Sequence, residues 1–286
     1  MRILAVLTMA MTMMAGPVAA ATPAVSSLFV FGDSYSDSGA GYVDGNGPTA
    51  VVYMAQDLGL PLTYFGAPDA AGKGLNFAVS GAQTGMGEGQ VHPALPGAPA
   101  NRRGRGLLTQ LQDFEGLRQA GQVRVDPATL FFIAGGLNDR KLETATTVAN
   151  LEALIRQLYA DGGRNFVIAR LPARIPQFAD VGARLNPAIE QIPAELAPSL
   201  PGARIVLSHW GDFYDDVITQ PAKYGIVNTH DRCAGRATFG EDATPCAAPD
   251  TYFFYHEGHP STAVHRIVGH RLADEVRAAF SPSEPQ

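Results

Sequence analysis

Short apolar runs alternate with longer segments of helical periodicity over most of this chain. Each run has the length and bulk of a buried strand, and a polar loop with glycine, asparagine or proline commonly follows it. Strands are expected at residues 28–31, 75–79, 129–134, 165–169 and 204–208. Alternating strands and helices favour a parallel sheet, because a parallel return needs a crossover helix on one face. The sequence therefore predicts an α/β fold with a central parallel sheet covered on both faces.

Helices are expected at residues 49–58, 107–119, 145–160, 212–218 and 262–280. Two other segments lack such periodicity. Residues 86–106 are rich in Gly, Pro and Ala, and a loop of that length inside a compact domain is commonly functional, so we expect a flap without regular structure beside a site. Several prolines between 172 and 201 predict that helices there are short or broken.

The first 20 residues have the pattern of a secretory signal peptide. Arg2 precedes a nearly continuous apolar run at 3–15, and small residues then allow cleavage near Ala20 or Ala21. That run is too short to span a membrane comfortably, although an uncleaved anchor is the alternative. We therefore expect a signal peptide at 1–20, a single domain at 21–286, and a secreted or periplasmic location.

The two cysteines agree with export. Cys233 and Cys246 are the only ones in the chain. In an oxidising compartment they are expected to form a disulfide. Without a second pair of ligands they make a poor zinc site.

Polar residues follow several of the expected strands and suggest a chemical site. Ser34 follows the first strand, Gly81 the second and Asn138 the third, while His259 precedes the last helix. Serine becomes a nucleophile when an imidazole takes its proton. Backbone N–H groups and an asparagine amide are suitable donors to the oxyanion that then forms on an ester carbonyl. These residue types together are the parts of an acyl-transfer site.

The sequence around these residues resembles a known family. The segments are Gly32-Asp33-Ser34-Tyr35, Asn76-Phe77-Ala78-Val79-Ser80-Gly81, Gly136-Leu137-Asn138-Asp139 and His259-Pro260-Ser261. They are similar to the four blocks of the GDSL, or SGNH, hydrolases, in the family's order, and the resemblance covers residues 28 to about 276. One block alone would be weak evidence, whereas four in order are specific.

The resemblance implies a three-layer, flavodoxin-like α/β/α sandwich and a serine ester hydrolase of the esterase, lipase or phospholipase type. It implies that Ser34 is the nucleophile and carries the acyl-enzyme, and that His259 is the general base. The Ser34 N–H, the Gly81 N–H and the Asn138 side chain then form the oxyanion hole. The family needs no cofactor and no metal.

Two positions depart from the family's pattern. Tyr35 replaces the usual leucine after the serine. His256 stands where the family has an aspartate three residues before the catalytic histidine. A neutral imidazole accepts a hydrogen bond but supplies no negative charge, so we expect a Ser34–His259 dyad with no anion beside the imidazolium. His256, a water or a backbone carbonyl near it is a candidate for orienting His259, and Glu257 is one residue out of phase.

Two alternatives keep the same residues: acyl transfer to an acceptor other than water, and a binding protein that has lost its activity. A net charge of -6 and a pI near 5.6 give no sign of nucleic-acid binding. We expect a small-molecule or lipid ester as substrate, no nucleic-acid partner, a monomer, and at most a transient contact with membranes or lipid surfaces.

Overall fold

The computed structural model describes residues 25–92 and 101–280, so the signal peptide expected at 1–20 lies outside the described residues. A six-stranded sheet forms the centre of the molecule, with the strand order β2-β3-β1-β6-β7-β8. Every pair of neighbouring strands in this sheet runs parallel. Its strands are β1 (Ser27–Gly32), β2 (Leu62–Tyr64), β3 (Gly74–Asn76), β6 (Thr129–Ala134), β7 (Asn165–Ala169) and β8 (Arg204–Ser208).

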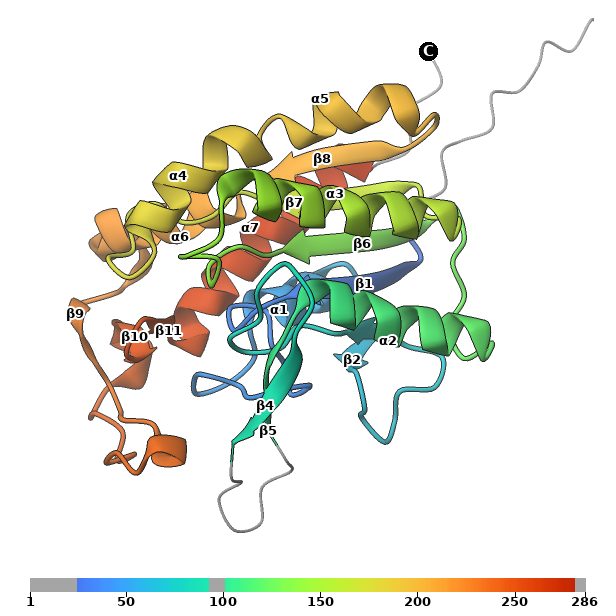
Figure 1. Cartoon of the computed structure of the whole chain (residues 1–286). Helices are drawn as coiled ribbons and strands as arrows, with labels where there is room; N and C mark the ends of the chain where they lie inside the picture. Colours follow the sequence, from blue (N-terminus) through green and yellow to red (C-terminus); the bar gives the residue numbers. More distant parts are fainter. Residues whose placement is uncertain (1–24, 93–100, 281–286) are drawn as a thin grey trace, which may run out of the picture.

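Helices cover both faces of this sheet (Figure 1). The helices are α1 (Ala50–Asp57), α2 (Leu107–Gln119), α3 (Thr144–Ala160), α4 (Ala179–Ile189), α5 (Ile192–Leu196), α6 (Trp210–Thr219) and α7 (Thr262–Phe280). On one face α7 packs against α1 and α6, and on the other α3 packs against α2, α4 and α5. The predicted α/β fold, a parallel sheet between two helical layers, is confirmed.

The two central strands, β1 and β6, are the reason that the site can form where it does. Their apolar side chains are buried throughout, as expected when helices cover both faces. Gly32 pairs with Ala134, so the loops after β1 and β6 leave the sheet at the same level. From β1 the chain goes first to β2 and β3 on one side and then to β6 on the other. Ligands in open α/β sheets bind at such a switch point.

Several predicted elements have the bounds that the structure shows, namely α2, α7, β6, β7 and β8. β3 ends at Asn76, three residues earlier than expected, although Phe77 and Val79 still donate backbone hydrogen bonds to β1. The expectation of an irregular flap at 86–106 is wrong in part. Strands β4 (Glu88–His92) and β5 (Asn101–Arg105) form an antiparallel ribbon there. Backbone pairing forms this ribbon without any regular apolar pattern in the sequence.

A second, three-stranded sheet carries the histidine loop. It consists of β9 (Asn228–Arg232), β10 (Tyr252–His256) and β11 (His259–Pro260), in the order β11-β10-β9. β10 was expected as an apolar run, but β9 was not, because its sequence Asn-Thr-His-Asp-Arg is polar and largely exposed. Tertiary pairing with β10, and not local propensity, makes this segment a strand.

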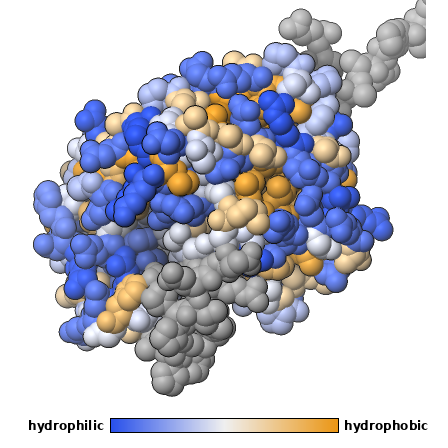
Figure 2. Space-filling view, in the orientation of Figure 1, coloured by the Kyte–Doolittle hydropathy of each residue, from blue (hydrophilic) through white to orange (hydrophobic). Residues whose placement is uncertain are grey.

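Short 3₁₀ helices complete the described chain: η1 (Ala197–Ser199), η2 (Pro221–Tyr224), η3 (Ala237–Phe239) and η4 (Pro249–Thr251). The proline-rich segment forms only α4, α5 and η1, as expected from its prolines. Figure 2 shows a mostly hydrophilic face with a few apolar patches among the helices. Within residues 25–92 and 101–280, no helix combines the length and the apolar character needed to cross a bilayer.

Candidate active site

Ser34 lies in a tight turn directly after β1. The backbone N–H groups of Ser36 and Asp37 donate to the Asp33 carbonyl, and the Asp33 carboxylate accepts from the Tyr35 N–H. Asp37 stabilises the following residues, because its carboxylate accepts backbone N–H groups from Gly39, Gly41, Tyr42 and Ser80. The turn therefore presents Ser34 at the end of the sheet from a rigid backbone.

The two aspartates of this turn serve the backbone. Burial raises the pKa of Asp33 to about 7, with a smaller contribution in the same direction from the nearby Asp139. Burial also raises the pKa of Asp37, although four backbone hydrogen bonds act against it. Their contacts support the expected turn-stabilising role of both carboxyl groups.

His259 reaches Ser34 from the second sheet. Its Nε2 lies 2.8 Å from the Ser34 Oγ. Gly258 adopts a φ of +71°, a left-handed conformation that glycine takes without strain, and this turn places His259 at the start of β11. The Tyr35 hydroxyl donates to the Gly258 carbonyl at 2.8 Å, so the residue after the serine holds the residue before the histidine.

Three groups surround the other ring nitrogen of His259. The distances to Nδ1 are 2.8 Å from Arg236 Nη2, 3.1 Å from the Glu257 carbonyl oxygen and 3.4 Å from Asp44 Oδ2. Burial lowers the pKa of His259 below 6.5, and the charge of Arg236 acts in the same direction, whereas Asp44 and the Glu257 carbonyl oppose the shift. The backbone carbonyl considered from the sequence is present, but the expectation that no anion lies beside the imidazole is wrong.

The side chain of His256 is directed at Asp44. Its Nδ1 lies 2.7 Å from Asp44 Oδ1, while its backbone pairs across the strands with His259. The Glu257 carboxylate is exposed and lies 3.8 Å from Arg232, so its carbonyl, and not its side chain, reaches the ring. Asp44 was missed at the sequence level because it sits in an aperiodic, glycine-rich loop 212 residues from His256.

The loops expected to supply the oxyanion donors lie against each other. Gly81 has a φ of +79° and is exposed, and the Gly104 N–H of the β4–β5 ribbon donates to the neighbouring Ser80 carbonyl. Asn138 donates through Nδ2 to the Ala82 carbonyl at 2.9 Å. The roles of Gly81 and Asn138 in stabilising an oxyanion stay predictions.

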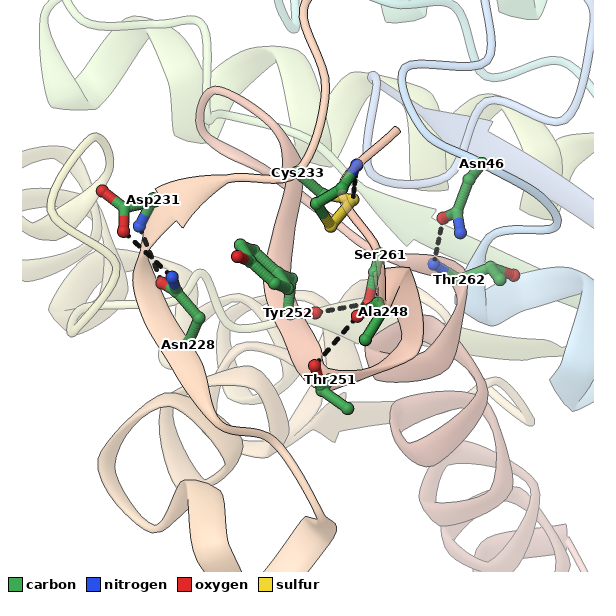
Figure 3. The surroundings of a disulfide bond; sticks show 10 residues. Asn46, Asn228, Asp231, Cys233, Ala248, Thr251, Tyr252, Ser261 and Thr262 are labelled. Atoms are coloured by element: carbon green, nitrogen blue, oxygen red, sulfur yellow. Dashed lines mark hydrogen bonds between the residues drawn. A yellow bond between two sulfur atoms is a disulfide. The ribbon is translucent and has the colours of Figure 1, made fainter. Parts of the chain in front are cut away.

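The predicted disulfide between Cys233 and Cys246 is present (Figure 3). It closes a loop of 13 residues that contains Arg236. The Cys233 N–H also donates to the Phe254 carbonyl of β10, and the Cys246 N–H donates to the Cys233 carbonyl. The disulfide loop is thereby attached to the strand that leads into the histidine turn.

The sequence matches the family model described as "GDSL-like Lipase/Acylhydrolase" over residues 28–272. GDSL esterase/lipase 7 of Arabidopsis thaliana is 23% identical over 319 aligned positions, which cover 87% of each chain. A second GDSL esterase/lipase of that plant is 26% identical over 332 positions, covering 90% of this chain and 84% of the relative. Among solved structures, a lipase/acylhydrolase from Enterococcus faecalis superposes with a TM-score of 0.45 and 15% identity, covering 91% of this chain and 100% of that one.

Proposed function

The chain belongs to the GDSL-like lipase/acylhydrolase family, and is thus a carboxylic ester hydrolase, and we propose that it works through an acyl-enzyme formed on Ser34. The observation that carries this proposal is the 2.8 Å distance between Ser34 Oγ and His259 Nε2. A serine this close to an imidazole is poised to lose its proton as it attacks a carbonyl carbon. The rigid turn after β1 and the tie from Tyr35 to Gly258 hold the pair together.

The reaction then proceeds in two halves. In the first, His259 Nε2 takes the proton from Ser34 as Oγ attacks the ester, and the imidazolium returns the proton to the leaving alcohol. In the second, His259 activates a water that releases the acid from Ser34. The Ser34 N–H, the Gly81 N–H and the Asn138 amide are the proposed donors to the oxyanion. The Asn138 amide has two N–H groups, so its bond to Ala82 leaves one available.

Ser34→Ala tests the proposal directly. We expect a folded protein whose turnover of a short-chain nitrophenyl ester is at least about 10⁴-fold lower, because the remaining donors catalyse only weakly without the nucleophile. A fluorophosphonate probe should label the wild-type protein on Ser34 and leave the variant unlabelled. Full activity or persistent labelling of the variant would place the nucleophile elsewhere.

We further propose that the protein is exported. The signal-like pattern at 1–20 and the disulfide between Cys233 and Cys246 both support an oxidising location. Mass spectrometry of the protein from a secreting host should find a mature N-terminus near Ala21. Recovery of the full-length chain from the reducing cytoplasm alone would contradict export.

A further inference from the structure

We propose that Asp44 is the carboxylate that orients His259 and offsets the positive charge of its imidazolium. This inference rests on the proposed function, because it assigns a role to Asp44 only if His259 is the base. In such a pair, a carboxylate at Nδ1 selects the correct ring tautomer and stabilises the cation formed when Nε2 takes the serine proton. Asp44 acts through His259, and is therefore a positioning residue.

The geometry directs one carboxylate oxygen at the imidazole. Asp44 Oδ1 accepts from His256 Nδ1 at 2.7 Å and from Arg236 Nε at 2.9 Å. Oδ2 also lies 3.1 Å from Arg236 Nε, and it faces His259 Nδ1 at 3.4 Å. The side chain is only 2% exposed, so little water screens these charges. Catalytic hydrogen bonds are commonly long before substrate binds, and 3.4 Å is within that range.

The groups around Nδ1 compete for two tautomers of His259. Nε2 can accept the serine proton only when the ring proton is on Nδ1. Arg236 Nη2 favours the opposite tautomer, because a guanidinium only donates and it lies 2.8 Å from Nδ1. The Glu257 carbonyl favours the productive tautomer but already accepts from Arg236 Nη2 at 2.6 Å. A negative charge on Asp44 is therefore needed to retain the proton on Nδ1.

The charge state of Asp44 is suited to this role. Burial alone would raise its pKa, but the hydrogen bond from His256 and the charges of His259 and Arg236 outweigh burial and hold the pKa of Asp44 below its usual range. Asp44 thus stays ionised when His259 is neutral. His256 takes no position on His259 in this arrangement; it holds the carboxylate that does.

The segment that carries Asp44 is held from several sides. Before it, Asp37 accepts the backbone N–H groups of Gly41 and Tyr42. After it, Asn46 accepts the N–H of Thr262 at the start of α7, at 2.8 Å (Figure 3). Arg236, which binds the carboxylate, is itself inside the disulfide loop. A carboxylate held in this way can orient a ring without a large loss of conformational entropy when substrate binds.

Asp44→Asn removes the charge with almost no change of shape. We expect kcat to fall by about 10²- to 10⁴-fold with little change in KM, because the charge matters mainly after proton transfer. The titratable or charged side chains around the ring are Asp44, Arg236, His256, Tyr35 and His265. Of these Asp44 raises the pKa of His259, so its loss should move the acid limb of kcat/KM to lower pH. Asp231→Asn, at an exposed carboxylate bonded to Asn228, is the matched control.

A second substitution asks whether the role can be returned to its usual place. In the Asp44→Asn background, His256→Asp restores a carboxylate three residues before His259, and His256→Asn is its uncharged counterpart. The proposal expects the aspartate to recover at least about 10-fold more kcat than the asparagine. Equal activity of the two, or a folded Asp44→Asn variant with wild-type kcat and an unmoved acid limb, would overturn it. Loss of activity in Glu257→Gln alone would assign the role to that side chain instead.

If Asp44→Asn does not fold, its unpaired guanidinium can be removed as well. The charge-balanced double variant Asp44→Asn, Arg236→Gln should then be at least about 10-fold less active than Arg236→Gln, and equal activity would overturn the proposal. Ser34→Ala separates the two levels of inference. If Ser34→Ala stays active, the proposed function fails and this inference with it. If Ser34→Ala is inactive while the Asp44 variants are fully active, only the role of Asp44 is wrong.

Discussion

The serine side and the histidine side of the site are built in different ways. Around Ser34, most hydrogen bonds join residues close in sequence, such as Asp37 to the N–H groups two to five residues later. Around His259, the contacts join distant segments: Asp44 to His256 over 212 residues, and Tyr35 to Gly258 over 223. Local bonds re-form whenever the turn forms, whereas distant bonds depend on the whole fold. The histidine side is therefore where substitution should do most to separate activity from folding.

The largest expected effect comes from removing the imidazole itself. His259→Ala should lower kcat by about 10⁴-fold or more, because Ser34 loses its base. His256→Ala is the matched control, since its Nδ1 contacts Asp44 and not the reacting atoms. It should cost much less, and the measurement is kcat on one ester for both purified variants. If the two are equally damaging, His256 acts on the reaction directly and the two-sided description fails.

Asn138→Ala tests a donor on the sheet side of the site. We expect kcat to fall by roughly 100-fold with a smaller change in KM, because an oxyanion donor acts mainly on the transition state. Gln83→Ala is the control: its side chain donates to the Asn138 carbonyl and is exposed. Steady-state kinetics at several substrate concentrations distinguish the two parameters. An effect confined to KM would mean that Asn138 binds substrate without stabilising the oxyanion.

The disulfide is a long-range element of the histidine side alone. Replacing Cys233 and Cys246 by serine should lower the free energy of unfolding by about 3 kcal/mol, from the entropy of a short closed loop. Because Arg236 lies in that loop, activity should fall before the protein unfolds on reduction, while fluorophosphonate-accessible Ser34 remains in its turn. Denaturant unfolding and esterase assays with and without reductant provide the measurement. Two free thiols in the unreduced, unfolded protein would show that no bridge forms.

Tyr35→Phe breaks the tie between the two sides with the smallest chemical change. It leaves the Gly258 carbonyl without the tyrosine hydroxyl, and we expect about 1–2 kcal/mol lower stability together with a several-fold lower kcat. Tyr214→Phe is the matched control, because its hydroxyl contacts His265 in the same aromatic cluster but no residue of the histidine turn. It should cost similar stability and leave kcat unchanged. Equal losses of kcat would trace the effect to the cluster as a whole.

The sequence by itself determined the elements that depend on local interactions. The apolar run of β1, its breaking glycine and the polar turn after it predict a strand that ends at Ser34, because each feature acts within a few residues. The same holds for α2 and α7, whose apolar spacing has the period of a helix. The order of four motifs predicted the family, and a pair of cysteines in an exported chain predicted the disulfide.

Only the tertiary structure decided what lies behind His259. No local pattern marks Asp44, because its loop has neither apolar periodicity nor a motif, and the substitution at His256 pointed to an absent carboxylate. β9 was missed for the same reason, since pairing with β10 makes a strand of a polar sequence. A carboxylate can serve an imidazole from any segment that the fold brings within a few ångströms. Its position is therefore set by packing between distant segments, which residue order alone does not encode in a readable form.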